Sequence, residues 1–202
     1  MRRPFRVPLL PFVLVVALSL WACWIPENFD AKVTINKDGS YAFTYDGTLT
    51  FALALGAAKD GSLSAKDEAE LEKAAQELRR EPGFKKVGYQ GKGRYKVFVE
   101  KTGKAGEPFY FVSREMPFFT VQPKENHTVA VTAIRPSQQD IQQLNSMGAK
   151  LEGTLSVAVA SGVKVIKHNA DSEPIFFGLI GPYKWQIRSP EANPVIVVQL
   201  SQ

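Results

Sequence analysis

The stretch that decides the fold is residues 32–46, which read KVTINKDGSYAFTYD. Residues 32–36 alternate polar and apolar side chains, as a half-buried β-strand does. Asp38-Gly39 follows, and this pair is typical of the tight turn in a β-hairpin. The alternation resumes over residues 41–46, and the apolar run 49–55 extends it. The stretch therefore predicts a long, bent antiparallel hairpin.

Further segments of the chain have either the period of a strand or the period of a helix. Ser64 and Ser137 are each followed by an aspartate three residues later, which predicts capped starts for helices over 65–81 and 138–148. Further strands are predicted at 84–90, 94–102, 109–114, 117–122, 128–134, 150–160, 164–167, 183–188 and 195–200. Runs of strands joined by short turns favour an α+β fold. We expect one curved, mainly antiparallel sheet of about nine or ten strands with two helices.

The N-terminal segment predicts export and anchoring. Three arginines precede an apolar run over residues 7–20, the pattern of a secretory signal, and the run is too short to span a bilayer comfortably. It ends in Leu20-Trp21-Ala22-Cys23, which resembles the bacterial lipobox, whose cysteine is acylated and becomes the first residue after cleavage. The domain plan is a lipoprotein signal peptide at 1–22, an acylated Cys23 with a tether to residue 30, and a single α+β domain at 31–202.

Acyl chains on Cys23 would hold the protein on an extracytoplasmic membrane surface. In lipoproteins an Asp directly after the cysteine marks inner-membrane retention, and here the position holds Trp24. The resemblance therefore implies the periplasmic face of the outer membrane if the cell is Gram-negative. The alternative is an ordinary signal peptide cut elsewhere, with Cys23 a stray thiol.

Composition argues against a nucleic-acid partner. The net charge of +5 includes three arginines of the signal segment, so residues 23–202 hold 22 basic and 20 acidic side chains. The two histidines, His127 and His168, stand alone without metal-ligand spacing. The chain has neither a Gly-rich phosphate loop nor a nucleophile elbow. We expect no catalytic residues, no metal and no cofactor, and we do not expect an enzyme.

Two aromatic stretches stand out as candidates for binding. They supply the candidate contacts to an apolar ligand or a membrane, which are Phe109, Phe111, Phe118, Phe119, Phe176, Phe177, Leu179, Ile180 and Trp185. Apolar side chains in such stretches pack in the core, line a pocket or contact a lipid surface. The sequence leaves these alternatives open.

The C-terminal part also resembles a known family. Ser161-Gly162-Val163, His168-Asn169-Ala170 and the strand with Tyr183-Lys184-Trp185 have the order seen at the end of the LppM-type bacterial lipoprotein domain. This resemblance implies a small domain of mixed α and β structure, likened to lipid-binding domains, and a role in binding envelope lipids or glycolipids.

The main hypothesis is a non-enzymatic envelope lipoprotein whose domain binds a lipid or another apolar ligand. The second is a structural or assembly lipoprotein that docks on another envelope protein, and the third is an enzyme with dispersed residues. The first predicts a dry aromatic cavity and the second a filled core with an exposed apolar patch. The third predicts a cleft with clustered polar groups.

Overall fold

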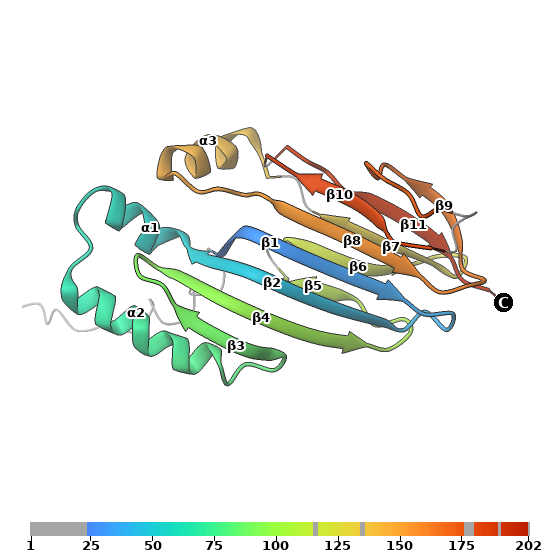
Figure 1. Cartoon of the computed structure of the whole chain (residues 1–202), viewed down its shortest axis with the longest axis horizontal. Helices are drawn as coiled ribbons and strands as arrows, with labels where there is room; N and C mark the ends of the chain where they lie inside the picture. Colours follow the sequence, from blue (N-terminus) through green and yellow to red (C-terminus); the bar gives the residue numbers. More distant parts are fainter. Residues whose placement is uncertain (1–23, 115–116, 134–135, 176–179, 190, 202) are drawn as a thin grey trace, which may run out of the picture.

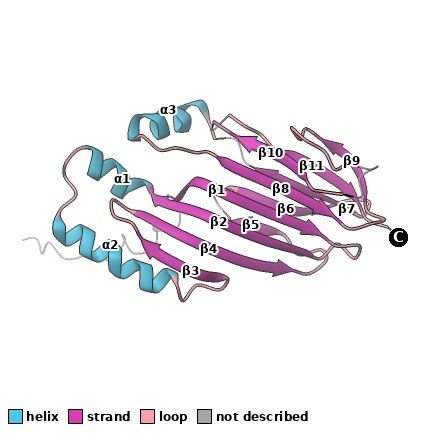
Figure 2. Cartoon of the chain, in the orientation of Figure 1, coloured by secondary structure: helices cyan, strands magenta, loops and turns pink. Residues whose placement is uncertain are grey.

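The computed structural model describes residues 24–114, 117–133, 136–175, 180–189 and 191–201, which form eleven strands and three helices (Figures 1 and 2). The strands are β1 (Trp24–Ile35), β2 (Tyr41–Phe51), β3 (Phe84–Tyr89), β4 (Arg94–Gly103), β5 (Phe109–Phe111), β6 (Phe119–Lys124), β7 (Thr128–Ala133), β8 (Gly153–Val159), β9 (Lys164–His168), β10 (Tyr183–Ile187) and β11 (Val195–Gln199). The helices are α1 (Ala52–Lys59), α2 (Ala65–Leu78) and α3 (Gln138–Met147).

The strands form two sheets. The six-stranded sheet has the order β10-β8-β1-β2-β4-β3, and the five-stranded sheet, which lies behind it in Figure 1, has the order β5-β6-β7-β11-β9. All neighbours are antiparallel except β1 and β8, which are parallel. The α+β prediction is confirmed. The expected single curved sheet is instead two sheets that share one core.

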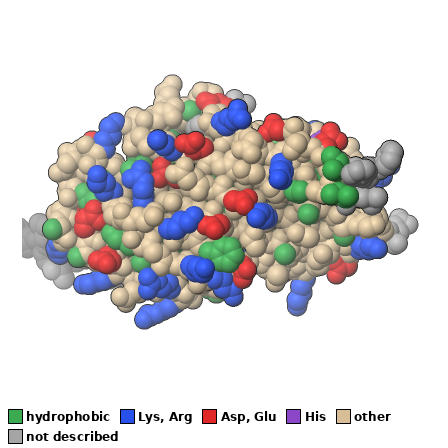
Figure 3. Space-filling view, viewed as in Figure 1, with side chains coloured by type: hydrophobic (Ala, Val, Ile, Leu, Met, Phe, Trp, Pro, Cys, Tyr) green, Lys and Arg blue, Asp and Glu red, His purple; other side chains and the backbone are tan. Residues whose placement is uncertain are grey.

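The core lies between the sheets. On β1 the side chains of Phe29, Ala31, Val33 and Ile35 are buried, whereas the residues between them are exposed. This alternation is the pleat of a strand with one face on the core. The outer face of the six-stranded sheet is the one seen in Figure 3, where acidic and basic side chains are interspersed. That outer face is in contact with water, and the apolar inner face of the strands packs against the second sheet.

The hairpin predicted from residues 32–46 is confirmed as β1 and β2, with Ile35 opposite Tyr41. Gly39 lies in the turn with φ +83°, a conformation that glycine adopts without steric cost. The Asp38 carboxylate accepts hydrogen bonds from the backbone and hydroxyl of Ser40 at 2.9 and 2.7 Å. These hydrogen bonds lower the pKa of Asp38.

Two expectations at the other end of this hairpin were wrong. Residues 24–30, expected as a tether, are the first half of β1, because Trp24 through Glu27 pair with the end of β2. The run 49–55, expected as strand, leaves the sheet after Phe51 and continues as α1. Alanine and leucine are strong helix formers, and the sequence of α1 is ALALGAAK. Ala54 and Leu55 are buried, so packing supports the helix that propensity favours.

Both predicted helix starts are confirmed as capping boxes. The hydroxyl oxygen of Ser64 accepts from the backbone N–H of Asp67, and the carboxylate of Asp67 accepts from the backbone of Ser64. Ser137 and Asp140 repeat the arrangement at α3, which ends at Gly148 with φ +72°. Within the described ranges, no helix is long and apolar enough to cross a bilayer.

The helices gather at one end of the molecule (Figure 2). This is the end where β1 begins and β2 finishes, since Trp24 pairs with Phe51 and α1 follows at once. The opposite end holds the β1–β2 turn and the C-terminal end of β11 (Figure 1). We call the first the helical end and the second the turn end.

Candidate functional site

The first aromatic stretch lies in the core. Phe109, Phe111 and Phe119 are at most 8% exposed. The ring of Phe43, on the facing sheet, lies 4.8 Å from the ring of Phe109 and 4.9 Å from that of Phe111. Phe118 is half-buried, and its ring meets that of Phe29 edge-on at 5.5 Å. The four candidate phenylalanines of this stretch pack between the sheets, and their rings fill the space that a dry ligand cavity would need.

Trp185 is also a core residue, 4% exposed. Its indole nitrogen donates to Oδ1 of Asn169 at 2.9 Å. The same oxygen accepts from the backbone N–H of Val195 at 2.8 Å, and the amide nitrogen donates to the carbonyl of Asn193 at 2.8 Å. Trp185 belongs to the six-stranded sheet and Val195 to the five-stranded one. Asn169 therefore connects the two sheets.

The second aromatic stretch leads into an exposed hairpin. The backbones of Ile175 and Ile180 exchange two hydrogen bonds, at 2.9 and 3.2 Å. Their side chains are 59% and 56% exposed, although large aliphatic side chains are usually buried. The chain between them reads Phe-Phe-Gly-Leu. Phe176, Phe177 and Leu179 lie outside the described residues, as does Cys23.

Ser172 bridges to Lys184 below this pair, so residues 172–175 and 180–184 are the two arms of one structure. We call it the isoleucine hairpin. Its second arm runs into Tyr183 of β10, which pairs with Val157 of β8, and Val157 pairs with Val33 of β1. The hairpin therefore lies at the turn end.

The distance between this hairpin and the start of the domain follows from the strand register. Val33 is nine residues beyond Trp24 on the same strand. At about 3.3 Å per residue, the base of the hairpin is roughly 30 Å from Trp24 along the strand direction. The arms continue away from β10, so Ile175 and Ile180 lie farther still.

Titratable groups lie beside the hairpin base. The ring of His168 lies 4.8 Å from the ring of Tyr183, and its Nε2 is 3.7 Å from a carboxylate oxygen of Glu173. Burial, and then the charge of Glu173, raise the pKa of Tyr183. The exposed ammonium of Lys184 adds a positive charge. The surface around the two isoleucines is thus mixed in charge.

An open hollow of about 520 Å³ lies elsewhere, beside the bulge in β1. Its lining residues come from β1, β8, β10 and the segments beside them, and they are Asn28, Phe29, Glu152, Gly153, Thr154, Gln186, Ile187 and Arg188. The side chains on its rim are mostly amides, a hydroxyl and two opposite charges. This hollow does not match the aromatic cavity that the main hypothesis predicted.

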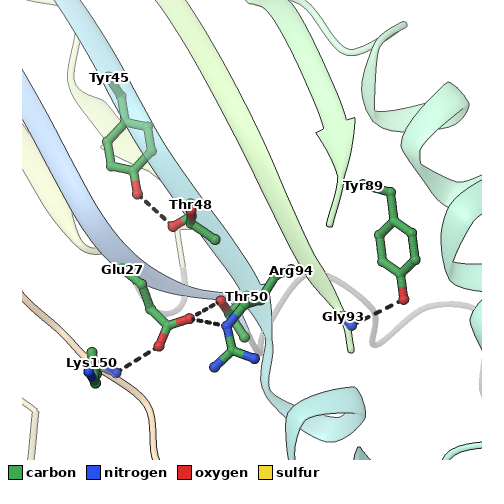
Figure 4. A network of polar contacts seen from close by, with 8 residues as sticks. All are labelled: Glu27, Tyr45, Thr48, Thr50, Tyr89, Gly93, Arg94 and Lys150. Carbon is green, nitrogen blue, oxygen red and sulfur yellow. Dashed lines mark hydrogen bonds and ion pairs between the residues drawn. The ribbon is translucent and has the colours of Figure 1, made fainter. Parts of the chain in front are cut away.

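One buried polar cluster was not anticipated from the sequence (Figure 4). Glu27 is 2% exposed and forms an ion pair with Arg94, whose Nε donates to it at 2.9 Å. The Thr50 hydroxyl donates to the same oxygen, and the backbone N–H of Lys150 donates to the other one at 2.7 Å. Both carboxylate oxygens are therefore satisfied. Residues 24–30, which read WIPENFD, mix apolar and polar side chains, and no local pattern marks Glu27 as buried.

No metal site emerges from the described part of the chain, where no three His, Cys, Asp or Glu side chains lie together. His127 is exposed in the β6–β7 turn with φ +53°, and His168 lies beside Tyr183. His168 has one carboxylate nearby, that of Glu173 at 3.7 Å, whereas a protein metal site takes three or four such ligands.

Comparison with known proteins gives structural likenesses alone. No family model and no curated protein matches the sequence. The NMR structure of the folded domain of the Mycobacterium tuberculosis LppM protein matches 89% of this chain and 92% of that chain, at 12% identity and a TM-score of 0.41. The match to this LppM domain is one of structure, at an identity too low to transfer any residue.

A crystal structure of an M1 zinc metallopeptidase from Deinococcus radiodurans also matches, at 11% identity and a TM-score of 0.34. The match covers 87% of this chain and 42% of the metallopeptidase chain. This chain therefore spans less than half of that protein.

Proposed function

We propose that this chain is a non-enzymatic lipoprotein of a bacterial envelope, anchored by acyl chains on Cys23, and that its domain binds a lipid or another apolar ligand through the isoleucine hairpin. The observation that carries the proposal is the exposure of Ile175 and Ile180, at 59% and 56%, on the two arms of one hairpin. Transfer of one such side chain out of water contributes about 1.5–3 kcal/mol.

The hairpin supports binding at a surface and not inside a cavity. The aromatic residues that could have lined a cavity contact one another across the sheets, as Phe43 and Phe109 do at 4.8 Å. An occupant of the core would have to separate these rings. The hairpin instead presents aliphatic side chains directly to solvent. The exposed isoleucines offer hydrophobic contact, which fits the binding of an apolar surface.

The anchoring part of the proposal comes from the lipobox-like end of the signal segment. Trp24, which follows Cys23 directly, is half-buried against the rings of Phe51 and Tyr95. Because the position after Cys23 holds Trp24 and not the aspartate that marks inner-membrane retention, the proposed location in a Gram-negative cell is the periplasmic face of the outer membrane.

The second candidate is docking on another envelope protein through the same hairpin. This candidate predicts a filled core with exposed apolar side chains, which agrees with the exposure of Ile175 and Ile180. The position of the hairpin favours it, because Ile175 and Ile180 lie at the end opposite Trp24. A hairpin that faces away from its own anchor meets components beyond the anchoring leaflet. An apolar groove on a partner would bury the two isoleucines as a lipid would.

The test uses residues 24–202, which contain every described strand and helix, once circular dichroism and a cooperative unfolding transition verify folding. Native mass spectra and lipid extraction report bound lipid, and co-sedimentation with envelope-lipid vesicles reports surface binding. The variants are Ile175→Ser with Ile180→Ser, and Phe176→Ser with Phe177→Ser. The matched control is Ile166→Ser, which removes an isoleucine that is 51% exposed on β9.

Lipid binding that is lost in both hairpin variants and retained in Ile166→Ser supports the proposed function. Binding that survives both variants overturns the assignment to the hairpin. A protein without bound lipid and without vesicle binding overturns the lipid proposal. In that case, crosslinking from Ile175 in intact envelopes tests the docking candidate, and one specific protein partner would support it.

A further inference from the structure

The folded domain begins directly after the predicted anchor, with no linker residues between Cys23 and β1. β1 starts at Trp24, which pairs with Phe51. The Trp24 ring packs against the rings of Phe51 at 5.7 Å and Tyr95 at 5.3 Å. Residue 23 is one peptide unit away, and adjacent Cα atoms are about 3.8 Å apart. Acyl chains on that residue would therefore begin at the surface of the folded domain.

A second apolar residue and a cation share this end. Leu53 follows Phe51 by two residues and is 67% exposed, the most exposed of the large aliphatic side chains in the described part of the chain. The β3–β4 turn lies beside the start of α1, since the backbone N–H of Phe51, the residue before α1, donates to the carbonyl of Gly93 at 2.8 Å. Lys92, in that turn, is exposed.

We propose that Trp24, Leu53 and Lys92 form a surface that rests on the leaflet that holds the anchor. The inference rests on the acylation of Cys23 and goes beyond it by fixing the orientation of the domain. The bilayer is the occupant because the chain outside the described residues ends here, at Trp24. The residue types agree: tryptophan favours the interface, leucine enters the acyl region, and lysine meets anionic headgroups.

Nearby charges are compatible with this contact. The carboxylate of Glu68 accepts from the Tyr89 hydroxyl and from the backbone N–H of Lys92, at 3.0 Å for the latter, so it is held by the protein. The ammonium of Lys59 donates to the carbonyl of Ser146. It therefore lies at the same end, beside α3, and adds a second positive charge.

The orientation has a consequence for the proposed function. With Trp24 on the bilayer, the strands rise from the membrane, and the isoleucine hairpin lies more than about 30 Å away from it. The hairpin then meets a ligand from outside the anchoring leaflet. The domain thus holds the exposed side chains of Ile175 and Ile180 at a distance from the bilayer that carries the anchor.

The test uses the full-length protein, purified with its acyl groups and placed in vesicles of phosphatidylethanolamine and phosphatidylglycerol. Intact mass first reports whether Cys23 is acylated. An environment-sensitive fluorophore is then attached to Leu53→Cys, Lys32→Cys or Ile175→Cys, and lipids with quenchers near the headgroup are added. Lys32 is an exposed residue in the middle of β1 and reports on a domain that lies flat.

We expect strong quenching and a blue-shifted emission at position 53, and severalfold weaker quenching at positions 32 and 175. An acylated protein with equal quenching at 53 and 32, or with stronger quenching at 175, overturns the orientation and leaves the proposed function intact. A protein without acyl groups overturns both the anchoring and the orientation. The native mass spectra and lipid extraction of the hairpin experiment do not depend on either result.

Discussion

The indole nitrogen of Trp185 donates a hydrogen bond to Oδ1 of Asn169 at 2.9 Å, and through this contact the edge of one sheet is tied to the other. Asn169 also accepts from Val195 and donates to Asn193, both at 2.8 Å. One side-chain amide thus satisfies a group on each sheet and a third on the segment that leads into β11. The His-Asn-Ala sequence, noted first for its resemblance to a family, has a physical role in this chain.

Replacement of Asn169 by alanine should destabilise the domain by about 2–4 kcal/mol, because it leaves the buried Trp185 nitrogen without an acceptor and removes two further hydrogen bonds. Urea unfolding followed by tryptophan fluorescence measures the loss. The matched control is Asn145→Ala, which removes an exposed asparagine from α3 and should change stability little. Equal effects of the two changes would contradict the role given to Asn169.

The second prediction concerns the ion pair of Glu27 and Arg94. Glu27→Ala should cost about 3–5 kcal/mol, since it leaves Arg94 and the Lys150 N–H without their acceptor at a site that is 2% exposed. Arg94→Ala should cost less than Glu27→Ala, because the Arg94 side chain is 30% exposed and Thr50 and Lys150 still donate to Glu27. Chemical denaturation measures both.

A double-mutant cycle separates the pair from its surroundings. If Glu27 and Arg94 act together, the double variant Glu27→Met with Arg94→Met should be more stable than the sum of the single changes predicts. Strict additivity would show that the two side chains contribute independently. Lys96→Ala is the control, as it removes the exposed ion pair with Asp46 and should cost less than about 1 kcal/mol.

Local features were well predicted from the sequence. The Asp38-Gly39 turn and the aspartates that cap α2 and α3 act on residues within three positions, so their effect is written in the adjacent sequence. The strand alternation of β1 was visible for the same reason. These features do not depend on which segment packs against which.

Long-range features were not predicted. Leu49–Leu55 alternates like a strand, whereas its last residues begin α1, where Ala54 and Leu55 are buried. Residues 24–30 looked like a polar tether because the partner of Glu27, Arg94, is 67 residues away. The division into two sheets rests on pairs such as β1 with β8, which are more than a hundred residues apart. The alternation of polar and apolar residues within one segment does not predict which distant segment pairs with it.

The nine candidate contact residues lie in different surroundings. Exposure at Ile180 agrees with a contact residue, whereas Phe109, Phe119 and Trp185 lie in the core. Aromatic residues alternate with polar residues along a strand in the same way whether they contact a ligand or pack against a second sheet. The sequence therefore located the apolar residues without stating which of them face solvent.

The third prediction compares two glycines with positive φ. Gly39 and Gly106 have φ of +83° and +77°, so alanine at either position should lose about 1–2 kcal/mol from backbone strain. A Cβ at Gly39 would also lie 2.6 Å from Cδ1 of Leu200, whereas nothing lies within 4 Å at Gly106. Gly39→Ala should therefore be the more destabilising change in thermal unfolding.

Removal of the obstructing side chain tests the cause. In the Gly39→Ala background, Leu200→Ala should cost less stability than it does in the wild-type chain, because it relieves the contact. If Leu200→Ala is equally costly in both backgrounds, the contact contributes nothing and the loss is backbone strain alone.

The last prediction concerns high pH. Burial, and then the hydrogen bond that its hydroxyl donates to Glu68, raise the pKa of Tyr89 to about 12. The neutral phenol is thus favoured in the folded state, whereas the unfolded chain ionises near its ordinary value of about 10. The resulting stabilisation is complete below about pH 10 and is lost as the pH rises toward 12.

Urea unfolding across this range should show a falling free energy of unfolding. Tyr89→Phe should reduce that slope without abolishing it, because burial also raises the pKa of Tyr45 and Tyr95. An unchanged slope in Tyr89→Phe would show that the hydroxyl of Tyr89 ionises equally in both states.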